Sequence, residues 1–146
     1  MIGAVLDANV FASGALRYNV LTSPPAAILR AWLRGSFELI TSDPMVAEIE
    51  RTLAQPYFSS RISRELHHEL LTELQSTATR TVLSVWVSSV ATHPEDDLVL
   101  ATAVSANADY LVTGDKPLQQ LRQYQSVPII SPRAFLTLLE EADQQR

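Results

Sequence analysis

The chain has 146 residues, 47% of them hydrophobic and 18% charged, a composition typical of a globular protein long enough to bury one core, so we expect residues 1–146 to form a single domain. The absence of cysteine excludes disulfides and thiolate metal sites, and the net charge of -5 argues against strong non-specific binding to nucleic acid through overall charge. No apolar run approaches the ~20 residues that cross a bilayer, and the N-terminal run contains Asp7 but no basic segment, so we expect no signal peptide, no membrane association and a cytoplasmic location.

The first half of the chain alternates predicted strands with predicted helices. The apolar run at residues 2–6 predicts a buried strand that ends at Asp7, and residues 37–41 predict a second strand. Between them, residues 23–34 predict a helix, because a serine and two prolines open it and apolar residues follow at helical spacing. Another helix is predicted to begin at Asp43, directly before a proline.

The second half continues the alternation. Residues 79–90 are rich in β-branched side chains and predict a strand. The segment from Pro94 predicts a helix that is apolar almost all round, which is typical of a buried helix. The remaining predictions are a helix over about 60–78, a strand over 110–112, a short helix over 117–124, a strand over 127–130 and a last helix over 132–142.

This order of elements predicts the α/β fold class. The clearest strands are continuous apolar runs, as in strands that are buried on both faces. We therefore expect a three-layer α/β/α arrangement with a central, mostly parallel sheet of four to five strands. In such sheets, ligands bind at the carboxyl ends of the strands.

Carboxylates stand at the positions where such a site is expected. Asp7 follows the first strand, and Asp115 follows the strand at 110–112. Thr113, two residues before Asp115, is expected on the same side of the pleat as Asp115. Glu48 lies in the second turn of the helix that begins at Asp43. Each acid has an ordinary alternative reading as a turn, a cap or a solvated side chain, so the prediction depends on the set.

Asp96 and Asp97 are adjacent at the start of the apolar helix. Acids in a first helical turn favour the helix dipole and cap free N–H groups. One aspartate suffices for a cap, and we predict that Asp97, beside the apolar body of the helix, points into the site. A shift of one residue would exchange the two roles, so Asp96 is the alternative.

The fold prediction brings these carboxylates to one edge of the sheet. Gathered there, they would repel one another and raise each other's pKa values unless a cation lay among them. Oxygen-only ligands without cysteine favour Mg²⁺ or Mn²⁺. One or two such ions could support phosphodiester cleavage by activating a water and stabilising the leaving oxygen.

At these residues the chain resembles the PIN-domain family, and within it the VapC-like toxin components of bacterial toxin–antitoxin pairs. The resemblance runs in order from Met1 to about Leu139. It rests on Asp7 in LDANVF, on Glu48 in AEIERTL, and on the stretch PEDDLVLATAVSANADYLVTGDKPL, which contains Asp97 and Asp115.

The resemblance implies a metal-dependent ribonuclease that cleaves single-stranded RNA, with the four acids as its catalytic residues. Asp7, Asp97 and Asp115 would be metal ligands, and Asn9 and Thr113 match small polar positions near the metal. Asp97 is preferred to Asp96 because Ala101 then falls one turn later, where the family has a small residue. The resemblance also implies a cognate antitoxin as partner and a homodimer.

Two other functions are compatible with parts of the pattern. A phosphatase of the haloacid dehalogenase type also has an aspartate after its first strand, but it needs a second one where this chain has Asn9. A non-catalytic interaction module could keep the fold, although clustered acids without a metal are destabilising. For a nuclease, phosphate contacts would come from basic residues such as Arg17, Arg51 or Lys116.

Overall fold

The computed structural model describes residues 1–87 and 94–145, and its described residues contain a six-stranded sheet in the order β3-β2-β1-β4-β6-β5. All neighbouring strands pair in parallel except β5, which runs antiparallel to β6. The strands are β1 (Gly3–Leu6), β2 (Glu38–Thr41), β3 (Thr79–Arg80), β4 (Tyr110–Val112), β5 (Gln123–Tyr124) and β6 (Val127–Ile130).

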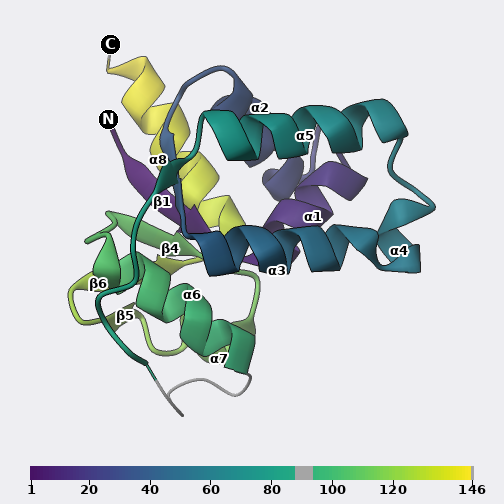
Figure 1. The fold of residues 1–146 in the computed structure, drawn as a ribbon. Helices are drawn as coiled ribbons and strands as arrows, with labels where there is room; N and C mark the ends of the chain where they lie inside the picture. Colours follow the sequence, from purple (N-terminus) through teal and green to yellow (C-terminus); the bar gives the residue numbers. More distant parts are fainter. Residues whose placement is uncertain (88–93, 146) are drawn as a thin grey trace.

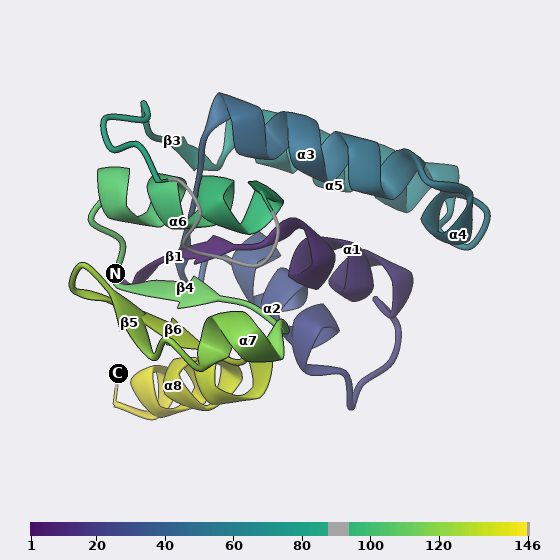
Figure 2. The ribbon, with the colours of Figure 1, turned by 90° about the horizontal axis from the view of Figure 1, so that it is seen from below.

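Helices cover the sheet on both faces (Figures 1 and 2). In chain order they are α1 (Ala8–Leu16), α2 (Pro24–Leu33), α3 (Asp43–Ala54), α4 (Pro56–Ser59), α5 (Arg64–Ser76), α6 (Pro94–Ser105), α7 (Lys116–Gln119) and α8 (Pro132–Gln144). The α/β prediction of a mostly parallel sheet between helical layers is confirmed.

Alternate residues of β1 point into two separate cores. Ala4 and Leu6 pack in the core formed with α1, α2, α8 and the apolar faces of α3 and α5. Val5 packs on the opposite face, in the core formed with α6 and α7. This alternation is the period-two pattern of a strand that is buried on both faces, and it explains the continuous apolar run in the sequence.

The central strands end together at one edge of the sheet. Leu6 of β1 pairs with Val112 of β4, and the Asp7 amide donates to the Val112 carbonyl at 3.1 Å. On the other side of β1, Val5 pairs with Ile40 of β2, so that β2 also ends here and leads into α3. The register therefore brings the residues after β1, β2 and β4 to a common edge.

Most predicted elements are present, but some segments differ from the prediction. The segment 8–16 was not predicted as structured, yet it forms α1, because Asp7 caps the helix by accepting from the Val10 amide. The close approach of α1 to α2 requires Gly14, where a Cβ would lie 2.7 Å from the Pro25 carbonyl oxygen. The predicted helix at 117–124 is wrong in its second half, because α7 ends at Gln119 and the chain turns back through β5.

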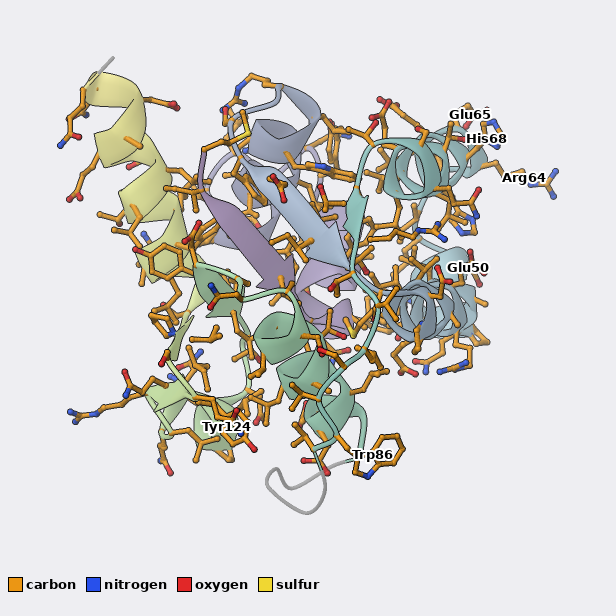
Figure 3. The ribbon with its side chains drawn as sticks, turned by 60° about the vertical axis from the view of Figure 1, so that its left-hand side comes forward. Glu50, Arg64, Glu65, His68, Trp86 and Tyr124 are labelled. Atoms are coloured by element: carbon orange, nitrogen blue, oxygen red, sulfur yellow. The ribbon has the colours of Figure 1, made fainter. Side chains whose placement is uncertain are left out.

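The strand predicted over 79–90 is only partly correct. Residues 79–80 form β3, whereas 81–87 are assigned to no strand and 88–90 lie outside the described residues. The amides of Ser84 and Val85 bond the Ser105 hydroxyl on α6 instead of a neighbouring strand, so this segment packs on a helix. Trp86, within it, is 90% exposed and projects into solvent (Figure 3).

The sheet also has one strand more than the four to five predicted, because the two-residue β5 is too short to show in the sequence pattern. In the part of the chain that the structure describes, none of the helices has the length and apolar character needed to span a membrane.

Candidate functional site

Asp7 lies at the centre of the candidate site. It follows β1 and caps α1, with its Oδ1 accepting from the Val10 amide at 2.8 Å. Asp7 is only 7% exposed to solvent. A buried aspartate at the junction of a strand and a helix is held in one orientation by the backbone on both sides, so the direction of its carboxylate is fixed by the fold.

Thr113 connects Asp7 to Asp115. The Thr113 hydroxyl donates to Asp7 Oδ2 in a short hydrogen bond and accepts from the Asp115 amide at 3.1 Å. The Asp115 carboxylate in turn caps α7 by accepting from the Leu118 amide at 2.9 Å. The fully buried Thr113 side chain therefore fixes both the Asp7 carboxylate and the backbone that carries Asp115.

Two cavities meet at Asp7. The larger, of about 450 Å³, is lined by Asp7, Asn9, Val10, Ser13, Pro25, Asp96, Gly114, Asp115 and Pro132. The smaller, of about 130 Å³, is lined by Asp7, Ala8, Asn9, Met45, Glu48, Thr52, Gln55, Asp96 and Val99. Because Asp7, Asn9 and Asp96 line both, the two cavities are neighbouring parts of one acidic cleft.

The structure places Asp96, and not the preferred Asp97, at this cleft. Asp97 lines a separate apolar hollow on the other side of the helix start, together with Trp86, Leu98 and Ala101. Successive residues of a helix point about 100° apart, which is consistent with Asp96 and Asp97 lining different cavities. Ala101 lies one turn after Asp97, and both line this hollow, which Asp7 does not line.

Glu48 reaches the smaller cavity from α3, as expected. Its carboxylate also pairs with Arg51 at 2.5 Å, one turn further along the helix. The other two basic residues suggested for phosphate contacts lie elsewhere: Arg17 is the C-cap of α1 and Lys116 is the first residue of α7. Neither lines a cavity that contains Asp7.

The surroundings of Asp7 raise the pKa of its carboxyl above the ordinary value of 3.8. Burial is the main cause, and the negative charge of Asp115 adds to it. The hydrogen bonds from Thr113 and from the amides of Val10 and Asn9 act in the opposite direction. A cation placed near Asp7 would oppose both causes of the increase, because it favours the charged carboxylate.

The donor set suits a hard divalent cation that keeps most of its water. Among the residues that the structure describes, no three histidine or acidic side chains converge into a ready-made metal-binding group. The larger cavity nevertheless gathers only oxygen donors, from Asp7, Asp96, Asp115 and Asn9. Mg²⁺ commonly binds through one or two carboxylates and several waters, which fits an open cavity of this kind.

The structure adds polar residues that the sequence did not single out. Thr52 and Gln55 line the smaller cavity, and Ser13 lines the larger one. The signal for the first two was present, because Glu48 and Thr52 are one turn apart on α3 and so share one face, and Gln55, the C-cap of the helix, follows three residues later. Without knowing that this face borders a cavity, the spacing had no meaning.

Thr113→Val should destabilise the protein by about 1–3 kcal/mol, the usual effect of leaving buried hydrogen-bonding groups without partners. The isosteric valine removes the donor to Asp7 and the acceptor for the Asp115 amide. Thr113→Ser keeps the hydroxyl and is the matched control. Denaturant unfolding of the three proteins measures the difference, and equal losses for valine and serine would mean that packing of the methyl group matters instead.

Comparison with known families gives one result for most of the chain. A family model described as PIN domain matches residues 3–117. This range contains Asp7, Glu48, Asp96 and Asp115 with the segments that position them. No curated protein matches the chain.

Proposed function

The chain belongs to the PIN-domain family, and from this premise we propose that it is a metal-dependent endoribonuclease that cleaves single-stranded RNA. PIN domains are generally nucleases. The observation that carries the proposal is the acidic cleft, in which Asp7, Asp96, Asp115 and Glu48 line two adjoining cavities. The family match also favours a nuclease over the phosphatase alternative.

In this proposal, Asp7, Asp96 and Asp115 hold Mg²⁺ or Mn²⁺, with Asp97 as the sequence-based alternative to Asp96. When bound, such an ion supplies Lewis acidity towards the scissile phosphate and the attacking water. Thr113 orients the Asp7 carboxylate through its hydroxyl, and this positioning role resembles that of partners that orient metal ligands in other sites. Asn9, which lines both cavities and is exposed, can donate a hydrogen bond to a water or a phosphate oxygen.

The shape of the cleft supports internal cleavage. Asp7 and Asp96 lie where the two cavities adjoin, so a strand can continue on both sides of the bond that is cut. An enzyme that binds a chain end would instead place its catalytic groups at a closed end of the cavity. Single strands as the substrate are what the resemblance to the VapC-like group implies.

A circular single-stranded RNA tests this proposal directly. We expect the purified protein to open the circle in Mn²⁺ or Mg²⁺ and to leave it intact in EDTA. A linear RNA of the same sequence and its annealed duplex are the matched controls, and the duplex should resist cleavage. The products separate on a denaturing gel.

Two results would contradict the proposal in different ways. Shortening of the linear RNA without opening of the circle would mean that the protein degrades RNA from its ends. No cleavage of any RNA, together with no change in thermal stability on adding Mn²⁺, would favour the non-catalytic interaction module.

The resemblance to the VapC-like group extends the proposal to a biological role. The chain would be the toxin of a toxin–antitoxin pair, would act in the cytoplasm as a homodimer, and would be held inactive by a cognate antitoxin. The sequence motifs around Asp7 and Asp115 support this extension.

A further inference from the structure

Arg51 is a basic residue that pairs with a residue of the acidic cleft. Its guanidinium pairs with Glu48 at 2.5 Å, and Glu48 lines the smaller cavity beside Asp7 and Asp96. A second side-chain ion pair joins Arg80 to Asp43, and neither of these residues lines a cavity that contains Asp7. Arg51 therefore brings positive charge to the rim of a cleft whose other charged lining groups are acids.

The helix spacing directs Arg51 along the cleft. Glu48 and Arg51, at i and i+3, share one face of α3, and Gln55, the C-cap of this helix, follows at i+7. Two of them line the smaller cavity. Arg51 lies between them in sequence, at the edge of this face, so its guanidinium can reach a strand that leaves the cavity along α3.

The pair with Glu48 leaves Arg51 accessible. The Arg51 side chain is 65% exposed, whereas the Glu48 side chain is 25% exposed. Exposed ion pairs are weak because both groups remain partly hydrated. A phosphate group offers a guanidinium two oxygens and can form a bidentate contact that replaces the pair.

We propose that Arg51 binds a backbone phosphate of single-stranded RNA at the α3 side of the cleft, and that Glu48 competes with the RNA for this arginine. Without RNA, Glu48 holds the guanidinium at the rim. When RNA binds, Arg51 turns to the phosphate and the Glu48 carboxylate is released towards Asp7 and Asp96. This inference rests on the proposed function, because it takes RNA as the ligand.

Binding in EDTA tests the competition without cleavage. The measurement is fluorescence anisotropy of a short labelled single-stranded RNA with the wild type, Arg51→Gln, Glu48→Gln and the double variant, over a series of salt concentrations. Arg51→Gln should weaken binding several-fold and lower the salt slope by about 0.7, the value for one lost phosphate contact on a single strand. Glu48→Gln should tighten binding, and most of this gain should vanish in the double variant.

Two matched substitutions, on α3 and α5, distinguish this role from a general effect of net charge on RNA binding. Glu50→Gln removes an acid two residues from Glu48, on the side of α3 that faces α5, where it accepts from Gln75 (Figure 3). Arg64→Gln removes an arginine that projects outward at the start of α5 (Figure 3) and lines neither cavity that contains Asp7. Both should change binding much less than their counterparts, and thermal melting confirms that every variant is folded.

The outcomes are distinct. Equal binding by the wild type and Arg51→Gln, at whatever strength, overturns the role of Arg51. An effect of Glu48→Gln that is unchanged when Arg51 is also replaced overturns the competition. Metal-dependent opening of circular RNA that Arg51→Gln leaves unaffected would reject this inference while the proposed function stands, whereas the absence of cleavage by the wild type would reject the proposed function itself.

Discussion

Asp96→Asn is expected to lower the rate of RNA cleavage by roughly 10²–10³-fold, the range observed when one electrostatic stabiliser of a reacting centre is removed. Asp97→Asn should leave the rate close to that of the wild type. The difference follows from the placement of two adjacent residues, because Asp96 lines both cavities at Asp7 and Asp97 lines the apolar hollow beside Trp86. The two substitutions are chemically identical, so each is the control for the other.

Single-turnover cleavage of a labelled RNA in Mn²⁺ measures this difference. Both variants should bind RNA in EDTA at least as well as the wild type, because each loses a negative charge, so a slow rate in one of them reports on chemistry. The reverse order, with Asp97→Asn inactive and Asp96→Asn active, would show that the sequence-based choice is correct. An equal loss of cleavage rate in both variants would mean that the two aspartates at the start of α6 contribute together.

The general architecture could be predicted because several independent sequence signals indicate it. Buried parallel strands need apolar residues on both faces, and β1 shows this as an uninterrupted run from Gly3 to Leu6. The helix starts were also visible, since Ser23 precedes two prolines and does cap α2. Such signals do not depend on the rest of the fold.

The differences between prediction and structure occur where tertiary contacts decide the outcome. The segment 81–87 has the β-branched composition of a strand, but its backbone bonds Ser105 on α6 and so leaves the sheet. The choice between Asp96 and Asp97 required the rotation of α6 about its axis. An almost wholly apolar helix gives no polar face from which to read this rotation, because both sides of its body are buried.

The positions of the acids along the chain could be predicted, whereas their electrostatics could not. That Asp7 and Asp115 follow neighbouring strands was visible once the sheet was inferred. The link between them through Thr113 depends on a hydroxyl that is both donor and acceptor, and on its complete burial. Burial of Asp7 is a property of the folded chain that no local pattern specifies.

Asp7→Asn is expected to make the protein more stable in EDTA and less stable than the wild type in Mn²⁺. Burial and the charge of Asp115 raise the pKa of Asp7, so the folded state holds this proton more tightly than the unfolded state does. The charged form of Asp7 is therefore less favourable to the fold than the neutral form. Asparagine is neutral, its side-chain oxygen can still accept from the Val10 amide, and its amide can donate to the Thr113 hydroxyl.

The pH dependence follows from the sign of this shift. Below the ordinary carboxyl value of 3.8, Asp7 is protonated in both states and the two proteins should differ little. As pH rises through the raised pKa of the folded state, the wild type loses stability relative to Asp7→Asn, and the full difference is present above that pKa. We expect the variant to melt a few degrees higher there, since about 1 kcal/mol moves the midpoint by roughly 2–8 °C.

Metal should reverse the order of the two proteins. A ligand at 100 times its dissociation constant stabilises the folded state by about 2.7 kcal/mol, and Asp7→Asn should lose most of this gain together with RNA cleavage. Thermal melting in EDTA and in increasing Mn²⁺, with the exposed Glu65→Gln on α5 as control, measures the crossing. A variant less stable than the wild type in EDTA, or a difference that stays constant with pH, would show that Asp7 stabilises the fold as a charged helix cap. A crossing would show that the chain keeps a destabilising carboxylate at the end of β1 because this carboxylate binds the metal.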